Sequence, residues 1–285
     1  MKQKLVILLS IIFTFIFATH LSSCSNNESN DILPNNSKSE EILQKYARFH
    51  NSGLDYIKYE AKKTSDKYTQ KHLEAVLGNY VISVYGKNNA NKIIKQIAPM
   101  EELAFNGNIP SLPQLTRSND SPNNSLAVEA ANECMNKITN YLKTFKDNEI
   151  FDNKFLLSDL HTIIIKTYND YASKSNSDKE KEILAQSLGV LYGSIEYWTN
   201  SDNVNSWSKI DIEASENTHS KITTTKNKGM KKAKENKNSK KLSKVDYITV
   251  VAAADTAGSF LGAAVASGPA AVAASAAAAL YFDVE

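Results

Sequence analysis

The sequence predicts an all-α fold: a bundle of about six helices, followed by a C-terminal Ala/Gly-rich apolar helical segment that can close into a helical hairpin. Three observations support this prediction. Apolar residues recur at intervals of three and four through residues 37–210, which is the period of an amphipathic helix. No stretch has the strict apolar–polar alternation of a half-buried strand. Alanine, the strongest helix former, dominates residues 247–285.

The first half of the bundle contains three helical stripes. Ser37 and Glu40 have the spacing of a capping box and should start the first helix. The apolar positions of the first two stripes are Ile42, Leu43, Tyr46, Phe49, Leu54 and Ile57, then Leu73, Val76, Leu77, Tyr80, Val81 and Val84. A third stripe covers residues 91–105, where Pro99 should kink or break the helix.

A proline-rich stretch, residues 106–124, predicts a long exposed loop between the two halves of the bundle. The second half contains three more stripes, and Ser177 with Glu180 forms another capping box before the last of them. The apolar positions are Ala131, Cys134, Met135, Ile138, Leu142 and Phe145, then Leu157, Leu160, Ile164, Tyr168 and Tyr171, and finally Leu184, Leu188, Leu191, Ile195 and Trp198. Six helices in residues 37–210 are enough to bury a core.

Residues 1–23 have the pattern of a lipoprotein signal peptide. Two lysines precede an apolar run from Leu5 to Ala18, as in bacterial signal peptides. The following stretch, LSSC, resembles the lipobox of bacterial lipoproteins. This resemblance implies cleavage between Ser23 and Cys24, diacylation of the Cys24 thiol and acylation of the new amine. The alternatives are a plain signal peptide with an incidental cysteine, or a transmembrane helix, although a span needs roughly 20 apolar residues.

The acyl chains would hold the mature protein at a membrane of the cell envelope, because two or more chains anchor a protein stably. Ser25, not Asp, follows Cys24. By resemblance to other lipoproteins, this favours the outer membrane over the inner membrane. Residues 24–36 are rich in Asn and Ser and predict a flexible tether. The expected partner of this end of the chain is therefore membrane lipid, bound through acylated Cys24.

Residues 211–246 form a Lys-rich linker between the bundle and the tail. From Lys221 to Asp246, ten lysines are offset by Glu235 and Asp246, which gives a net charge of +8. Such a segment has little to bury and should be disordered or loosely helical. It is either a solvated linker or, within residues 221–285, a binding site for anionic lipid or a second membrane. We do not expect nucleic acid as a partner, because the run lacks interleaved aromatic residues and belongs to an exported protein.

Residues 247–285 form an Ala/Gly-rich apolar tail, with Asp255 as its sole charge up to residue 282. Gly268 and Pro269 divide the tail as a hinge, and the arm before them would be about 31 Å long as a helix, close to the hydrocarbon thickness of a bilayer. One face of this arm carries small residues that permit close helix packing: Ala254, Gly258, Gly262 and Ala266. The tail therefore suits insertion into a membrane or among partner helices, and equally suits packing against its own bundle.

We expect neither an enzyme nor a metal or cofactor site. His50, His72, His161 and His219 lie on four different segments, without the spacing of metal ligands. There is no glycine-rich phosphate loop or nucleophile elbow, and no small-molecule substrate is evident. Cys134 lies on an apolar stripe and should be a buried thiol. Beside His50, Asn51 and Asp55 favour a polar network or a local cap.

Three stretches carry a resemblance: HNSGLDYI at residues 50–57, SIEYW at residues 194–198, and an Ala-Asp-x-x-Gly, Ala-rich segment at residues 253–280. They resemble a group of uncharacterised Gram-negative bacterial lipoproteins, and that resemblance implies no activity. The tail is also similar in kind to the small-residue zipper segments of bacteriocins.

The functional interpretation is an exported, lipid-anchored surface or periplasmic protein whose tail inserts into a membrane or packs with partner helices, as in a bacteriocin-like precursor. The alternative is a structural or partner-binding lipoprotein whose tail packs on its own bundle.

Overall fold

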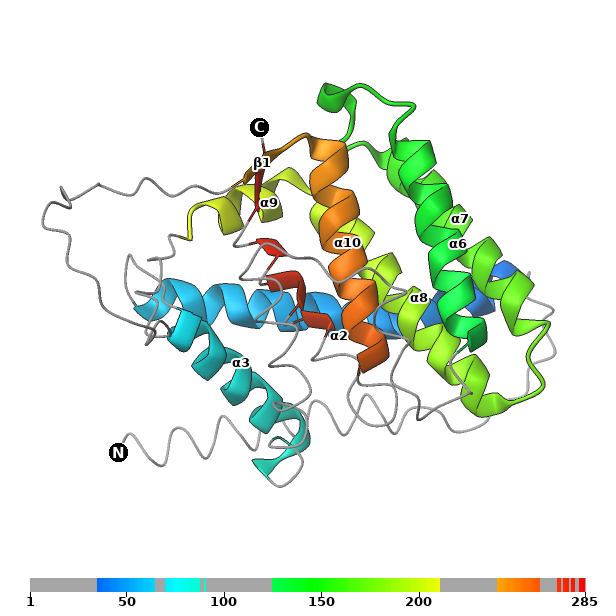
Figure 1. The fold of residues 1–285 in the computed structure, drawn as a ribbon, viewed down its shortest axis with the longest axis horizontal. Coiled ribbons are helices and arrows are strands. Elements are labelled where there is room, and N and C mark those ends of the chain that lie inside the picture. The colour runs from blue at the N-terminus through cyan, green and yellow to red at the C-terminus, as the bar shows by residue number, and fades with distance from the viewer. Residues whose placement is uncertain are drawn as a thin grey trace, which may run out of the picture. The chain divides into compact units, whose positions relative to one another are not determined.

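The computed structural model describes residues 35–64, 70–87, 90, 125–210 and 240–261, together with 271–272, 274–276, 278–279 and 282–284 (Figure 1). These residues are overwhelmingly helical, so the predicted all-α fold is confirmed. Residues Asn36–Glu285 form one compact unit. The signal peptide, with the cleavage position Ser23–Cys24, lies outside the described residues and stays a prediction.

Five of the six expected helical stripes coincide with helices of the structure. These are α2 (Asn35–Thr64), α3 (Gln70–Tyr85), α6 (Ser125–Leu142), α7 (Lys154–Ala172) and α8 (Asp178–Trp198). The remaining stripe, residues 91–105, and the proline-rich loop after it lie outside the described residues. A single turn, η2 (Asp147–Glu149), separates α6 from α7, and a short helix, α9 (Ser201–Ser208), follows α8 directly.

The helix starts show how local side chains set the boundaries. Ser177 is the N-cap of α8, as its position in the sequence predicts, but its side chain makes no capping hydrogen bond. Instead, Ser175 Oγ donates to Glu180 Oε2 at 2.7 Å. At α7, Asn153 Oδ1 accepts from the backbone N–H groups of Phe155 and Leu156, which satisfies two donors of the first turn. The predicted start is therefore correct at Ser177, whereas the predicted capping box is wrong.

The chain after residue 239 adds two short strands and a helix: β1 (Lys240–Leu242), α10 (Lys244–Leu261) and β2 (Phe282–Val284). The strands pair in parallel, with Lys240 opposite Phe282 and Leu242 opposite Val284. The sequence gives no sign of these strands, because three residues are too few to produce a recognisable alternation. This pairing brings the end of the predicted linker, residues 240–242, next to the last strand of the tail.

Two glycines let α8 lie directly against α2. A Cβ atom on Gly189 would lie 2.7 Å from Tyr46 Cβ, and one on Gly193 would lie 2.7 Å from Ala47 Cα. Both distances are too short for real atoms, so these positions require the absence of a side chain. Because residue numbers increase in the same sense on both helices, α2 and α8 run in the same direction at this contact.

The tail shares the core of the bundle. In Figure 1, α10 crosses in front of α8, on which it packs. The buried apolar residues that α10 and the rest of the tail contribute to the core cluster are Val245, Tyr247, Ile248, Val251, Ala252, Ala254, Ala257, Phe260, Val272, Ala274, Ala276, Ala278 and Ala279. Of the expected packing stripe, Ala254 and Gly258 are buried in α10, whereas Gly262 and Ala266 lie outside the described residues, as does the hinge at Gly268 and Pro269.

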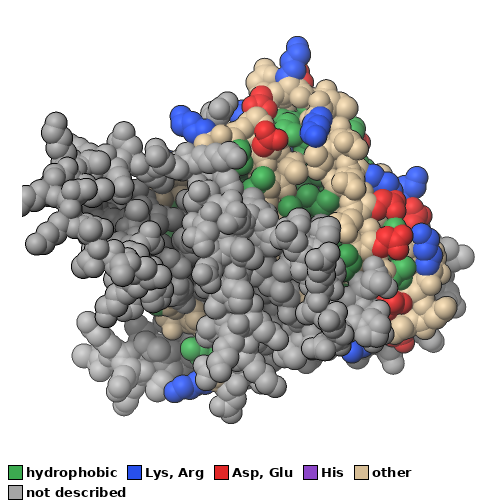
Figure 2. Space-filling view, viewed as in Figure 1, with side chains coloured by type: hydrophobic (Ala, Val, Ile, Leu, Met, Phe, Trp, Pro, Cys, Tyr) green, Lys and Arg blue, Asp and Glu red, His purple; other side chains and the backbone are tan. Residues whose placement is uncertain are grey.

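The surface and the helix lengths complete the description. In the described part of the chain, no helix combines the length and the apolar content needed to cross a membrane. On the face shown in Figure 2, basic and acidic side chains are interspersed among small apolar areas. The coloured part of this face has the mixed charge of a solvated surface. On α6, Lys137 and Glu133 form an ion pair one turn apart.

Candidate functional site

The three stretches singled out in the sequence meet in space. The junction, as we call it, consists of His50, Asn51, Gly53 and Asp55 of α2, Glu196, Tyr197 and Trp198 of α8, and Asp255, Val272 and Ser275 of the tail. Each pair of segments is linked by at least one contact between side chains: α2 with α8, α2 with the tail, and α8 with the tail. The junction is therefore the part of the molecule where the body binds the tail.

A fully buried ion pair lies at the centre of the junction. His50 Nε2 of α2 lies 3.3 Å from Asp255 Oδ1 of α10, and neither side chain is exposed. His50 Nδ1 lies 3.0 Å from Asn51 Oδ1, while Asn51 Nδ2 donates to Glu196 Oε2 at 3.3 Å. Both ring nitrogens of His50 thus lie near an oxygen atom, although the contact of Nε2 with Asp255 is not a well-aligned hydrogen bond. This arrangement favours the doubly protonated, positively charged imidazole.

The electrostatics of the pair agree with its geometry. Burial by itself lowers the pKa of His50, but the charge and contact of Asp255, with a smaller contribution from Asn51, outweigh burial and raise the pKa above its ordinary value. Among the described residues, neither oxygen of Asp255 has a well-formed hydrogen bond. The Asp255 carboxylate is therefore stabilised mainly by the positive charge of His50, and its burial depends on that charge.

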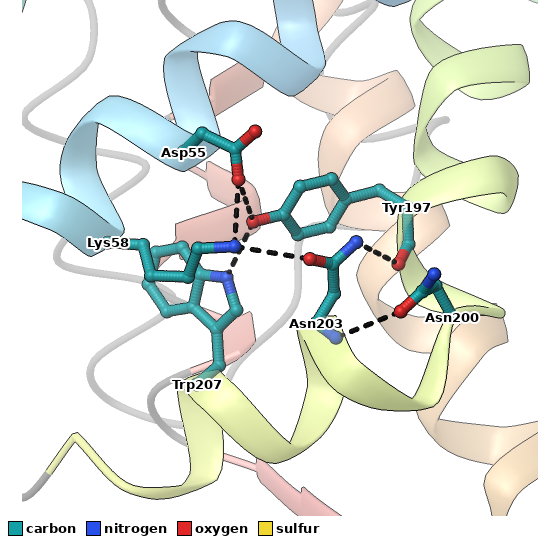
Figure 3. Close-up of polar contacts among 6 residues, drawn as sticks. All are labelled: Asp55, Lys58, Tyr197, Asn200, Asn203 and Trp207. Atoms are coloured by element: carbon teal, nitrogen blue, oxygen red, sulfur yellow. Dashed lines mark hydrogen bonds and ion pairs between the residues drawn. The ribbon is translucent and has the colours of Figure 1, made fainter.

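Tyr197 anchors the outer side of the junction (Figure 3). Its hydroxyl donates to Asp55 Oδ1 at 3.0 Å and accepts from Trp207 Nε1 at 3.1 Å. Lys58 Nζ lies 2.8 Å from Asp55 Oδ1 and donates to Asn203 Oδ1 at 3.1 Å. Burial, with Asp55 adding, raises the pKa of Tyr197, so the phenol stays protonated. This network fastens α2 to the corner between α8 and α9.

Asn203 and Asn200 complete the same network on the side of α9. Asn203 Nδ2 donates to the backbone oxygen of Tyr197 at 3.2 Å, and Asn200 Oδ1 caps α9 by accepting from the backbone N–H of Asn203 at 3.1 Å. The Asp55 side chain is 59% exposed and that of Lys58 is 17% exposed. The network therefore runs from solvent at Asp55 to the buried indole of Trp207.

The second half of the tail is held by Trp198 and Gly53. Trp198 Nε1 donates to Ser275 Oγ at 3.0 Å, and the hydrogen bond is buried. The Trp198 ring also packs edge-on against Tyr247 of α10, with 5.9 Å between the ring centroids. A Cβ atom on Gly53 would lie 2.6 Å from Val272 Cγ2, so only glycine lets this part of the tail approach α2. Both arms of the tail therefore contact the same short region of the body.

The other candidate groups lie apart from this chemistry. His161 stacks on Tyr192, with 3.6 Å between the ring centroids, and burial lowers its pKa to about 4. Cys134 is buried, as expected, and burial raises its pKa to about 12, so its thiol is not a nucleophile at neutral pH. The residues that the structure describes contain no group of three or more His, Cys, Asp or Glu side chains that could hold a metal ion.

The junction differs from the expected site in one respect. The sequence directs attention to the small residues Ala254 and Gly258, whereas the ion pair uses Asp255, the neighbouring charged residue. His50 and Asn51 belong to one polar network, whereas Asp55 belongs to another, with Tyr197 and Lys58. The partners on α8 and α10 could not be identified from spacing. The available signal was the single charge inside a long apolar run, which requires a partner of opposite charge if it is buried.

Comparisons with protein-family models, with curated proteins and with solved structures find no match to this chain. The chemistry of the junction therefore has to be judged from its own geometry.

Proposed function

We propose that the chain is an exported lipoprotein of the bacterial cell envelope, acylated at Cys24, that acts as a structural or partner-binding protein with its tail bound to its own bundle. The support for export and acylation is the signal-peptide pattern and the LSSC stretch. The support for a non-catalytic role is the chemistry of the junction, which fastens segments together and has a protonated phenol and a paired histidine.

The main support for a tail bound to its own bundle is the burial of Asp255 opposite His50. An ionised Asp at the centre of a membrane helix costs about 2.5–3.5 kcal/mol on insertion scales. In the body, the positive charge of His50 offsets part of the cost of burying this carboxylate. Ser275, a polar residue of the second arm, is likewise bound by Trp198. The polar groups of the tail thus find partners in the body that a lipid environment lacks.

Acylation is tested by feeding a palmitate analogue to cells that express the full chain. Cys24→Ala should lose the label and accumulate as the longer precursor. Cys134→Ala is the matched control, because it removes the other cysteine and should keep the label. A Cys24→Ala protein that is labelled and matured like the wild type would show that Cys24 is not the lipid site.

Docking of the tail is tested by limited digestion of the full chain in detergent with a lysine-specific protease. The first cuts should fall within residues 226–244, where lysines are dense. The released C-terminal fragment should still co-elute with the body on size exclusion, because the junction holds it. Immediate separation of the two fragments, or a first cut within α8, would contradict the docked tail.

A second candidate function is a membrane-active tail that the body keeps in reserve. The observation in its favour is that the second arm fills the core mainly with alanine: Ala271, Ala274, Ala276, Ala278 and Ala279 are buried. Burying a single methyl-sized group stabilises by only about 0.8 kcal/mol, compared with about 1.5–3 kcal/mol for Val, Leu or Ile. Such a segment leaves its binding site more easily than a leucine-rich one.

A synthetic peptide of residues 231–285 separates the two candidates. Dye release from vesicles of anionic phosphatidylglycerol by the peptide, with no release by the full chain, would support the reserve function. No release, and no helix induced by the lipid in circular dichroism, would remove it and leave the tail as a structural part of the body.

A further inference from the structure

The His50–Asp255 pair joins two segments that are far apart in the chain and buries both charges completely. Asp255 faces His50 from α10, and the neutral Asn51 faces it from α2 itself. From α8, Glu196 approaches through Asn51 and is itself exposed, with Arg48 of α2 acting on it. The described residues 271–279 carry no charged side chain. The pair is therefore an isolated charged unit within the contact between body and tail.

Two ionisable groups in such close contact titrate as one unit. With one proton in total, the unit is neutral, whether the proton resides on the imidazole or on the carboxylate. Loss of this proton leaves a net negative charge in the core. Gain of a second proton leaves a net positive charge in the core. Either change places an unpaired charge in a buried site, which strongly destabilises the packing around it.

We propose that His50 and Asp255 form a proton-operated latch, which holds α10 against the body while the pair carries one proton and loosens α10 when the pair loses that proton or gains a second. The latch rests on the docked tail of the proposed function, but not on acylation of Cys24.

The geometry explains why the latch acts on the tail and not on the whole bundle. Asp255 lies in the middle of α10, among Ala254, Ala257 and Gly258, whose small side chains provide little apolar contact of their own. The helices α6, α7 and α8, by contrast, are joined by leucine, isoleucine and aromatic side chains. A buried charge at Asp255 therefore acts on a part of α10 that is built from small residues.

The alkaline side of the latch has a definite sign. Because the pKa of His50 is raised in the folded protein, the stabilisation from its positive charge is complete below the ordinary histidine pKa of about 6.5. It is lost as the pH rises through the raised value.

Hydrogen–deuterium exchange on the full chain in detergent tests the latch, with rates corrected for the intrinsic effect of pH. Between about pH 4 and about pH 9, the protection of amides in α10 should pass through a maximum. It should fall about tenfold or more on each side, and further than the protection of α7. The double variant His50→Gln with Asp255→Asn removes both titrating groups and should give a flat profile for α10.

His161→Gln is the matched control, because it removes a half-buried histidine of α7 and leaves His50 and Asp255 in place. In this variant, the difference in protection between α10 and α7 should keep the pH dependence of the wild type. The latch would be overturned if α10 of the double variant kept the wild-type maximum in protection. It would also be overturned if, in the wild type, the protection of α10 changed with pH only as much as that of α7. If the double variant does not fold, the latch is judged from the wild type alone, by comparing the pH dependence of protection in α10 with that in α7. An α10 without protection at any pH would instead refute the docked tail, and with it the proposed function.

Discussion

Trp198 of α8 donates its indole N–H to Ser275 of the tail at 3.0 Å, across 77 residues of sequence and within the core. This is one of the few directional contacts between body and tail, because alanine side chains provide none. A hydrogen bond of this kind fixes the rotation and the register of the tail segment as well as stabilising it.

Ser275→Ala should therefore destabilise the protein. The substitution leaves the buried indole N–H of Trp198 without its acceptor, which costs about 1–3 kcal/mol of unfolding free energy. Chemical denaturation followed by tryptophan fluorescence measures the loss. Ser52→Ala is the control, since Ser52 is exposed and its hydroxyl bonds only to the backbone oxygen of Arg48. An equal loss of unfolding free energy for Ser275→Ala and Ser52→Ala would contradict the hydrogen bond between Trp198 and Ser275.

Gly193→Ala should lower stability, although alanine normally stabilises an exposed helix position by about 1 kcal/mol relative to glycine. The new Cβ atom would lie 2.7 Å from Ala47 Cα and would push α8 away from α2. Overpacking of this kind costs about 1–3 kcal/mol. Asn140→Ala, at an exposed position of α6, should be neutral or stabilising in the same thermal unfolding assay. A stabilised Gly193→Ala protein would show that the two helices do not touch there.

Tyr197→Phe should cost about 1–3 kcal/mol, because it leaves the buried indole N–H of Trp207 without an acceptor. Asp55→Asn should cost much less, about 1 kcal/mol or below, because the Asp55 side chain is 59% exposed and its contact with Lys58 is screened by water. A double-mutant cycle of Tyr197→Phe and Asp55→Asn, measured by urea unfolding, gives the coupling free energy between the two side chains. Absence of any coupling would contradict the hydrogen bond that joins them.

His161 should make the protein sensitive to acid. Burial lowers the pKa of His161 to about 4 in the folded protein, whereas the unfolded chain has an ordinary value of about 6.5. The unfolded chain therefore binds more protons in this window. Stability should be independent of this residue above about pH 6.5 and should fall as the pH drops towards about 4. His161→Gln should remove that part of the slope in unfolding curves recorded at several pH values. A variant with the wild-type slope would assign the acid sensitivity to other groups.

The sequence by itself determined the helices of the body. A helix is a local structure, and apolar residues three and four positions apart indicate it. On this basis the sequence predicts α8 from Leu184, Leu188, Leu191, Ile195 and Trp198. All five of these side chains are buried. Local patterns did not predict β1 and β2, because a strand of three residues is too short to show an alternation. In addition, the two strands that pair are far apart in the sequence.

Only the tertiary structure shows which surface the tail packs against. An Ala-rich helix with small residues every four positions fits a membrane, a partner helix or its own bundle equally well, because alanine contributes little to any of them. What distinguishes these environments is the partner of Asp255, and that partner, His50, lies about 200 residues away along the chain. No local pattern encodes a contact of this length. It arises because α2 and α8 pack closely at their glycines and so place His50, Gly53 and Trp198 on one surface.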